Sequence, residues 1–428
     1  MSAPLRIALV GPCRADLRSD CGGPDAVVAL LARGLAGRGE RVEVLSCDFE
    51  TKTDRLLEVE GVRLHRLAAR KTLGRATFYL LERRWIRRRL RELAPDVVHV
   101  HGTDFYGGVA ARHAGPTLLT VNALLARASD DLNGTPPLRR LPRTIRSLAM
   151  AGFEDRCLAR AREVVVPNRH LRAALEGRTR ARLHEIPEPI DPAYFDLPDR
   201  TVPDRLLYVG AIGPRKGLLD LAHALPEVAR VRPGVRLHVV GETADPGYAA
   251  AVSEAVQREG LGEAVVWRGP LDPRRLQEAF ASCSILVLPS AEELVPHVAA
   301  QAMAAGKPVV AHAVGAVPHV VVDGETGLLV PRGNPIAMAD ALLALLEDEP
   351  RRRAIGSRST AVARERFDPQ VVVDRTVRLY REVAGRDGSA RRATPARVWL
   401  SERIERMGGA QPVVARRAVG GTTFALPA

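Results

Sequence analysis

Short apolar runs alternate with longer amphipathic segments along most of this chain. A short apolar run bounded by polar residues predicts a buried strand, whereas apolar residues repeated every three or four positions predict a helix. The first half contains a helix of this kind over Asp25–Gly37, and its predicted strands are Arg6–Val10, Arg41–Ser46, Asp96–Val100 and Thr117–Val121. Strands that alternate with helices predict a parallel sheet with helices on both faces.

The same alternation starts again after a proline-rich stretch near the middle of the chain. Prolines recur within Ile186–Pro192 and again at Pro198 and Pro203, and such punctuation predicts a linker. The strands predicted beyond it are Arg205–Gly210, Leu237–Gly241, Val265–Trp267, Ile285–Pro289, Pro308–Ala311 and Leu328–Val330. We therefore expect two α/β domains with a boundary near residue 195, which suits a chain of 428 residues.

Composition places the chain among globular proteins, because 46% of its residues are hydrophobic and 26% are charged. No apolar run reaches the roughly 20 residues that span a bilayer, and the N-terminus lacks the pattern of a signal peptide. The cysteines lack metal-like spacing and indicate reduced thiols: Cys13, Cys21, Cys47, Cys157 and Cys283. We expect a cytoplasmic protein, with peripheral contact at the inner membrane surface as the alternative.

The net charge of +13 changes this picture at one segment. Arginines gather at positions 83, 84, 87, 88, 89 and 91, and Leu81, Trp85 and Leu90 recur among them at helical spacing. The segment is therefore a predicted basic amphipathic helix. A solvated face is the usual reason for such a pattern, and contact with a membrane surface is the alternative. No zinc-finger spacing or aromatic RNA-binding signature accompanies it, so we expect no nucleic-acid partner.

Glycine-rich loops follow the first strand of each half. Gly22 and Gly23 lie just before a helix, where glycine lets the backbone approach a phosphate or sugar, although a plain strand-to-helix turn uses the same residues. They are not part of a GxGxxG fingerprint, which argues against a dinucleotide cofactor. In the second half, Gly213–Gly217 contains Arg215 and Lys216 at a helix start. Cations there suit a pyrophosphate, and solvated loop charges are the competing interpretation.

The stretch 289–307 combines polar side chains with another helix start. Glu293 lies in a loop after a predicted strand, and Pro296 opens the next helix. His297 and Gln301 are four residues apart and therefore share one face of that helix. A carboxylate ahead of the helix and an amide inside it would hold sugar hydroxyls, while free helix N–H groups face a phosphate. An exposed side chain without a role is the alternative for Gln301.

These motifs resemble the GT4-type retaining glycosyltransferases of the GT-B fold. Glu293 together with the block Gln301–Val310 is similar to their E-x7-E-A-M-A-x-G-x-P-V-V pattern. Further segments agree with the family in order and spacing, from residue 5 to about residue 383. They are Asp96–His101, which resembles the PDVVHxH strand, Tyr208–Gly217, which resembles the VGRxxxxKG loop, and the later segments Val314–Pro318 and Asp323–Val330.

The resemblance implies two doubly wound, Rossmann-like parallel-sheet domains that face a cleft. Residues 1–195 would form the acceptor domain, residues 196–368 the nucleotide-sugar donor domain, and residues 369–384 a C-terminal crossover helix. Residues 385–428 are expected to be a basic tail, in which Val398–Met407 is a further candidate helix. The chain departs from the family at four positions. It has Ala211 where the family has an arginine and Asn122 where the family has a histidine. It also has Gln301 and His319 where the family has glutamates.

The resemblance also implies a nucleotide-diphosphate sugar, such as a UDP-sugar, as substrate and no separate cofactor. Lys216, assisted by Arg215, would stabilise the departing phosphate without a metal, because the sequence has no DxD triplet. Glu293 would orient the donor sugar, and Asn122 would bond the sugar or the acceptor. The remaining predicted donor-binding residues are Gly22, Gly23, His297, Val298 and Gln301, and the predicted acceptor-binding residues are Asp16, Asp20 and Asp104.

The expected activity is retaining transfer of a hexosyl or N-acetylhexosaminyl unit. The composition favours a small-molecule acceptor of secondary metabolism, an aminocyclitol or another natural-product scaffold. One alternative is a lipid or polysaccharide glycosyltransferase at the membrane surface, and another is a sugar-nucleotide epimerase or phosphorylase of the same fold. A third alternative is a non-catalytic GT-B partner subunit, against which the intact Lys216 and Glu293 argue.

Overall fold

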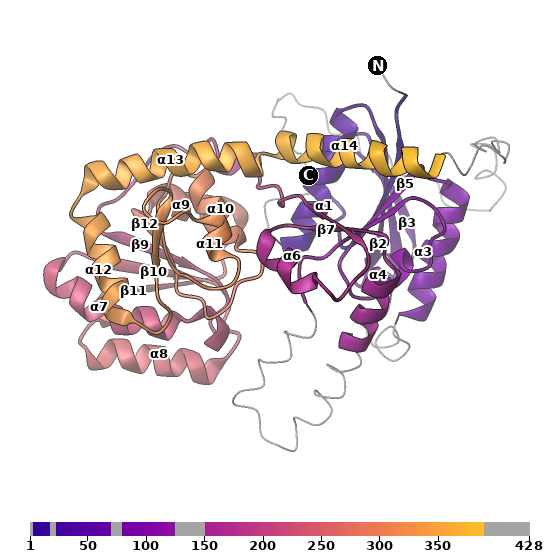
Figure 1. Ribbon diagram of the computed structural model, residues 1–428. Helices are drawn as coiled ribbons and strands as arrows, with labels where there is room; N and C mark the ends of the chain where they lie inside the picture. The colour runs from indigo at the N-terminus through magenta and orange to yellow at the C-terminus, as the bar shows by residue number, and fades with distance from the viewer. Residues whose placement is uncertain (1–2, 18–22, 70–78, 125–149, 389–428) are drawn as a thin grey trace, which may run out of the picture.

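The computed structural model describes residues 3–17, 23–69, 79–124 and 150–388. They form two lobes, each built around one sheet that helices cover on both faces (Figure 1). The strand order is β3-β4-β2-β1-β5-β6-β7-β8 in the first sheet and β11-β10-β9-β12-β13-β14 in the second. Two α/β domains, as the sequence predicted, therefore account for the described residues.

The first lobe contains the predicted strands and others that the sequence did not reveal. Its helices are α1 (Gly23–Gly37), α3 (Leu80–Leu93), α4 (Gly107–Ala110) and α6 (Arg169–Leu175), and residues 150–160 are also helical. Its strands are β1 (Arg6–Val10), β2 (Arg41–Asp48), β3 (Arg55–Val59), β4 (Val62–Ala68), β5 (Val97–His101), β6 (Thr117–Thr120), β7 (Glu163–Val166) and β8 (Arg182–Glu185).

One strand corrects the expectation of a purely parallel sheet. β3 runs antiparallel to β4, while every other neighbouring pair in the first sheet is parallel. Glu60 and Gly61 join the two strands, with φ values of +50° and +77°. Two consecutive residues with positive φ form the tight turn that suits a hairpin. β3 is also largely exposed at the sheet edge, so it lacks the apolar run that marks a buried strand.

Alternating side chains on β1 fill two separate cores. Ile7 and Leu9 pack with α1 on one face of the sheet, whereas Ala8 and Val10 pack with α3 and α4 on the other. Successive side chains of a strand point to opposite faces, so a strand buried on both faces is apolar throughout. This double burial explains why β1 is visible in the sequence as an unbroken apolar run.

The second lobe is a fully parallel sheet with its own two cores. Its strands are β9 (Arg205–Val209), β10 (Arg236–Val240), β11 (Val265–Gly269), β12 (Ile285–Leu288), β13 (Val309–His312) and β14 (Gly327–Val330). Its helices are α7 (Leu218–Val231), α8 (Pro246–Arg258), α9 (Pro273–Ser282), α10 (His297–Ala304), α11 (Val317–Val320), α12 (Pro335–Leu346) and α13 (Glu349–Phe367). The short 3₁₀ turns are η2 (Pro192–Tyr194), η3 (Pro214–Lys216) and η4 (Gly262–Ala264).

The C-terminal helix α14 (Pro369–Gly388) returns to the first lobe. Figure 1 shows α13 and α14 as consecutive helices that run along one side of the molecule from the second lobe to the first. Val373 and Tyr380 belong to the core that β1 and α1 build, and the Tyr380 hydroxyl lies 2.6 Å from Nδ1 of the buried His99. The helix extends four residues beyond the predicted end at 384, and the candidate helix Val398–Met407 lies outside the described residues.

The segment between the two sheets runs from the end of β8 at Glu185 to the start of β9 at Arg205. It carries η2, and the backbone N–H of Ile190 donates to the carbonyl of Phe367 at 2.9 Å. The linker is thus bonded to the end of α13, close to where the chain crosses back as α14. The predicted domain boundary near residue 195 falls within this segment.

Candidate active site where the two lobes meet

The second sheet has a topological switch point between β9 and β12. These strands are neighbours in the sheet, although the chain forms β10 and β11 between them. The first sheet has the same arrangement at β1 and β5. Ligands of open α/β sheets bind in the crevice outside the carboxyl ends of such strands. The loops after these four strands are therefore the expected place for a site.

The loop after β9 is held tightly against the loop after β12. Gly217 has a φ of +65°, and a Cβ atom there would lie 1.9 Å from the carbonyl oxygen of Pro289. Only glycine permits this approach. The backbone N–H of Ala291 also donates to the carbonyl of Arg215 at 2.9 Å. These contacts fix η3, and with it Lys216, beside the loop that follows β12.

Lys216 and Glu293, both predicted site residues, form an ion pair across these two loops. Lys216 Nζ lies 2.5 Å from Glu293 Oε1, and Ser290 Oγ donates to the same oxygen at 2.7 Å. Glu293 is only 4% exposed. Its backbone carbonyl accepts from the N–H of Ala316 at 2.8 Å, and Gly315 passes too close to that carbonyl for any Cβ atom. The carboxylate is therefore fixed by the loops after β9, β12 and β13.

Helix α10 begins just beyond Glu293, with Pro296 at its N-cap position. The backbone N–H of His297 already donates to the carbonyl of Val295, and those of Ala299 and Ala300 donate to the carbonyl of Pro296. Among the described hydrogen bonds, none uses the N–H of Val298. Of the first amides of α10, the one at Val298 is thus available to an anion, and the helix dipole favours such a ligand.

His297 makes a contact that the sequence did not predict. Its Nε2 lies 2.5 Å from Oε2 of Glu188, a buried residue of the proline-rich linker. Burial lowers the pKa of His297, but the Glu188 carboxylate, helped by Glu293, outweighs burial and raises that pKa above its usual range. The charged form of His297 is therefore favoured more than it would be in an isolated imidazole. The sequence placed Glu188 only in the predicted linker, and its one local signal is an acid flanked by Pro187 and Pro189.

The first lobe contributes the end of β5, where His101 lies near Glu188. His101 is 2% exposed, and neither ring nitrogen has a hydrogen-bond partner among the described residues. Burial lowers the pKa of His101 to about 4, and the nearby Glu188 carboxylate opposes this shift only in part. Asn168, after β7, donates from its side-chain amide to the carbonyl of Leu294 at 2.7 Å. Asn168 thus ties the first lobe to the loop that holds Glu293, and sequence reasoning missed it.

The other predicted residues of the first lobe lie in loops after β1, β5 and β6. Gly23 is the first residue of α1, Asp16 is exposed beside Arg14, and Asn122 is half-buried after β6. Burial raises the pKa of Asp104 to about 6, although Tyr106 donates its backbone N–H to the carboxylate. No described hydrogen bond or ion pair joins Asp104 to Lys216 or Glu293. The predicted residues Gly22 and Asp20 lie outside the described part of the chain.

The remaining donor-site candidates differ in their exposure. Gln301 is 8% exposed on α10, so its alternative interpretation as an exposed side chain is wrong. Val298 is half-buried, whereas Arg215 is exposed. Arg215 therefore takes part in the loop contact described above through its backbone, and its guanidinium lies at the surface.

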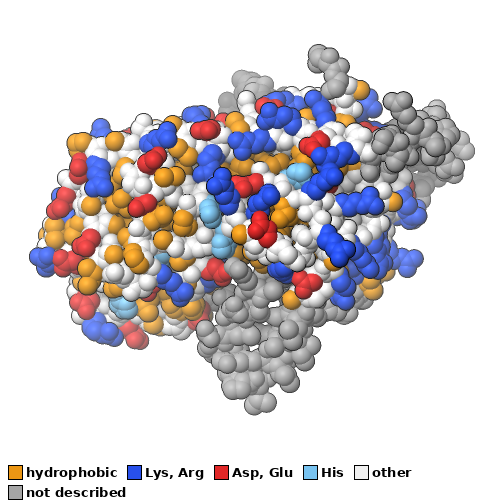
Figure 2. Space-filling view, in the orientation of Figure 1, with side chains coloured by type: hydrophobic (Ala, Val, Ile, Leu, Met, Phe, Trp, Pro, Cys, Tyr) orange, Lys and Arg blue, Asp and Glu red, His pale blue; other side chains and the backbone are white. Residues whose placement is uncertain are grey.

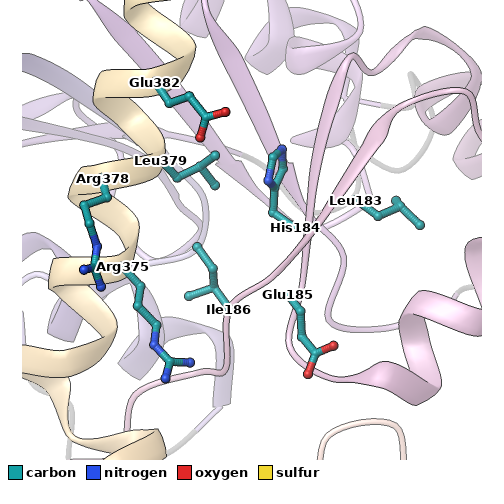
Figure 3. Close-up of a pocket in the computed structure, with 8 residues that line it drawn as sticks. All are labelled: Leu183, His184, Glu185, Ile186, Arg375, Arg378, Leu379 and Glu382. Carbon is teal, nitrogen blue, oxygen red and sulfur yellow. The ribbon is translucent and has the colours of Figure 1, made fainter.

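Two hollows on the described surface lie away from these loops. One, of about 510 Å³, is lined by β8 and α14, from which His184 and Arg378 project (Figure 3). The other, of about 620 Å³, is lined by α3 and the loop that precedes β6. Over the residues that the structure describes, no group of His, Cys, Asp and Glu side chains suits a metal ion. No helix in that part of the chain is long and apolar enough to cross a bilayer.

Comparisons with known proteins agree with this arrangement of sheets and loops. Residues 21–194 match the family described as Glycosyltransferase Family 4, and residues 203–348 match Glycosyl transferases group 1. Sucrose-phosphate synthase from Thermosynechococcus elongatus has a similar fold, with a TM-score of 0.70 and 23% identity, over 89% of this chain and 99% of that one. Anabaena HepE, solved with UDP and glucose, has a TM-score of 0.64 and 17% identity, over 88% and 100%.

Relatives with known names point the same way. D-inositol 3-phosphate glycosyltransferase of Xylanimonas cellulosilytica is 28% identical over 81% of this chain and 88% of its own length. The enzyme of that name from Corynebacterium diphtheriae is 36% identical over 35% of this chain, and the match spans only 36% of the relative. Phosphatidyl-myo-inositol mannosyltransferase of Mycobacterium leprae is 36% identical over 40% of this chain and 44% of its length. The two family matches and the two-sheet fold together place this chain in the GT4-type glycosyltransferases of the GT-B fold.

Proposed function

We propose that this protein transfers a hexosyl or N-acetylhexosaminyl unit, with retention, from a nucleotide-diphosphate sugar to an acceptor hydroxyl. The Lys216–Glu293 pair at the switch point of the second sheet is the observation that carries the proposal. It offers a cation for a departing diphosphate and a fixed carboxylate for sugar hydroxyls, at the edge where α/β sheets bind ligands. Anabaena HepE, which shares the fold, has been solved with UDP-glucose, and this supports a nucleotide-sugar donor.

Charge stabilisation is the main task of the site in this proposal. Lys216, the free N–H of Val298 and the cationic form of His297 would all favour the negative charge that grows on the diphosphate as the glycosidic bond breaks. Groups fixed before the reaction need no reorganisation during it. Because these cations and amides supply the countercharge, we propose that transfer needs no divalent metal.

Glu293, which precedes α10, would hold the sugar, and Gln301, which lies on α10, would hold the ribose. Glu293 would accept hydrogen bonds from sugar hydroxyls while it keeps Lys216 in place. Gln301, which is buried on α10, would accept one bond from the ribose through its amide oxygen. The leaving phosphate itself would take the acceptor proton on the same face of the sugar. Asn122 suits that route, because an amide positions a hydroxyl but does not remove its proton.

The acceptor would bind to the first lobe, in the loops after β1 and β5 that contain Asp16 and Asp104. We propose that the acceptor is a polyhydroxylated ring such as a cyclitol. The aminocyclitols of secondary metabolism belong to this class. The names of the inositol phosphate relatives support this class, although several of the matches span less than half of the relative. Asp104 would accept hydrogen bonds from ring hydroxyls when it is ionised, that is, above about pH 6.

A donor screen followed by an acceptor screen tests the proposal. Thermal shift with UDP-, GDP- and ADP-sugars should identify a stabilising donor, because a ligand that binds only the folded state raises its stability. Release of the nucleoside diphosphate is then measured with myo-inositol, D-inositol 3-phosphate and aminocyclitols. Release that depends on an acceptor supports transfer. Donor binding without turnover for any acceptor would instead favour a non-catalytic subunit.

A further inference from the structure

The hollow of about 620 Å³ lies at the amino ends of strands in the first sheet, whereas the proposed active site lies at the carboxyl ends. Ala94 and Pro95 precede β5, and Ala114 and Gly115 precede β6, so these lining residues mark the amino ends of both strands. The proposed acceptor loops follow the carboxyl ends of strands in the same sheet. We call this hollow the arginine pocket, after its charged lining: Arg84, Arg87 and Arg91 from α3, and Arg112 from the loop after α4.

The four arginines of the arginine pocket have no carboxylate partner among the described residues. Neighbours on the same helix behave differently. Arg88 Nε lies 2.9 Å from Glu92 Oε1, and Arg89 Nη1 lies 2.9 Å from Glu92 Oε2. Within the described residues, the α3 arginines that line the hollow are therefore unpaired, whereas Arg88 and Arg89, which do not line it, share Glu92. Figure 2 shows Lys and Arg side chains gathered over the part of the first lobe where Figure 1 places α3.

Like charges converge on Arg87 in particular. It is half-buried, and burial together with the charges of Arg112, Arg84 and Arg91 lowers its pKa below the usual range. An arginine still keeps its charge at neutral pH, so the repulsion persists in the folded protein. Arg87 Nε donates to the backbone carbonyl of Arg83 at 3.1 Å, which restrains the side chain but does not neutralise it.

The end of α3 offsets only a small part of this charge. Leu90, Arg91 and Ala94 lie at the C-terminus of the helix, where the dipole supplies roughly half a negative charge. Four guanidinium groups exceed that several-fold. A bound anion would turn mutual repulsion into attraction, and the concave shape would bring it within reach of side chains from both segments.

We propose that the arginine pocket binds a phosphate-bearing anion. Guanidinium groups match phosphate oxygens in pairs of parallel hydrogen bonds, and one phosphate group offers about two negative charges and three acceptor oxygens. This site is separate from the donor diphosphate site, which lies on the other sheet, and its existence does not depend on the proposed activity. The anion is either a soluble phosphorylated compound or a phosphorylated lipid headgroup.

The test compares two double variants of equal charge. Arg87→Gln with Arg112→Gln removes two guanidinium groups from the arginine pocket. Arg88→Gln with Arg274→Gln is the matched control, because these exposed arginines do not line the arginine pocket and each pairs with a glutamate of its own helix. Both pairs are made in the full chain and in the Lys216→Ala background, which separates the pocket from the donor site. Pyrophosphate binding is measured by calorimetry, and vesicle binding by flotation with phosphatidylcholine, with and without phosphatidylglycerol.

The pocket variant should bind pyrophosphate at least about tenfold more weakly in both backgrounds, because it loses the charge-assisted hydrogen bonds of two guanidinium groups. The control variant should bind as the unmodified protein does. A loss seen only with anionic vesicles would assign the site to a lipid headgroup, and a loss seen with pyrophosphate alone would assign it to a soluble phosphate. Equal binding by the pocket and control variants, with both probes, would overturn the proposal. Circular dichroism melting shows that the compared variants are folded.

Discussion

Lys216, which is partly exposed, neutralises the buried carboxylate of Glu293, so neither residue acts alone. Replacing Lys216 by alanine leaves a carboxylate that is 4% exposed and that keeps, among the described side chains, the hydrogen bond from Ser290. Besides any effect on catalysis, Lys216→Ala should therefore lower the free energy of unfolding, by an amount of the order of the 1–3 kcal/mol typical of an unsatisfied buried group. A second substitution is needed to separate the two effects.

We expect Lys216→Ala to lower turnover about a hundredfold, because it removes a fixed charge that would stabilise the departing diphosphate. It should also lower the melting temperature. Adding Glu293→Gln should restore much of the stability, since a neutral amide tolerates the loss of the cation, but it should not restore turnover. Steady-state kinetics and thermal denaturation of both variants check this. Near-normal turnover in Lys216→Ala would remove this lysine from the site.

Gln301 allows a second prediction for a single residue. Gln301→Glu places a carboxylate on α10 at a position that is 8% exposed, which should destabilise the free protein. Because a carboxylate makes stronger bonds to ribose hydroxyls than an amide does, UDP should bind the variant at least as tightly and raise its melting temperature by more. Calorimetric titration and thermal shift measure both effects. Loss of nucleotide binding in a folded variant would show that this residue does not face the ribose.

The linker and α10 are joined by one ion pair, Glu188–His297, which makes their contact sensitive to pH. The folded pKa of His297 is raised above the ordinary value of 6.5. The charged pair therefore stabilises the fold fully below about pH 6.5, and this contribution is lost as the pH rises through the folded pKa. His101 acts in the opposite sense: its folded pKa of about 4 means that stability falls as the pH drops below 6.5.

We expect Glu188→Gln to lower the pKa of His297 and to destabilise the protein more near pH 6 than near pH 9. NMR titration of the imidazole and denaturation at the two pH values measure these effects. Glu43→Gln is the matched control, because it removes a carboxylate 2.6 Å from His65 within the first sheet. If Glu188→Gln and Glu43→Gln leave the titration of His297 equally unchanged, the ion pair does not control that histidine.

Apolar periodicity was enough to predict several strands buried on both faces, such as β1, β9 and β12, but it missed β7, which is also buried throughout. It did not reveal β3, because an exposed edge strand joined by a tight turn lacks an apolar run. The same limit applies to the site. Lys216 and Glu293 were recognisable from motif spacing, whereas Glu188 and Asn168 act through contacts with segments more than a hundred residues away. Such contacts follow from the packing of the two lobes, which no local pattern encodes.

At the scale of the whole molecule, the site is assembled from both lobes. Leu294 and Val295, beside Glu293, pack against the core of the first lobe, while Asn168 and Glu188 contact the same region from the other side. The family resemblance correctly indicated the GT-B architecture with two α/β lobes. It did not indicate that the linker contributes a charged residue, Glu188, to the candidate site.

Sugar transfer should continue in excess EDTA after dialysis. The countercharge that a metal would provide is supplied in our proposal by Lys216, the amide of Val298 and His297. The assay compares initial rates with EDTA, with added magnesium and with added manganese. Activity that is abolished by EDTA and restored by either ion would mean that ligands outside the proposed set neutralise the phosphate.

The most direct measurement is an NMR assay of sugar transfer with the stabilising donor, its anomeric carbon labelled with carbon-13, and a cyclitol acceptor. It reports at once whether a glycosidic bond forms, with which anomeric configuration, and at what rate. We expect a product with the same anomeric configuration as the donor, formed about a hundredfold more slowly by Lys216→Ala. A product of inverted configuration, or equal rates for the unmodified protein and the variant, would contradict retaining transfer at the Lys216–Glu293 site.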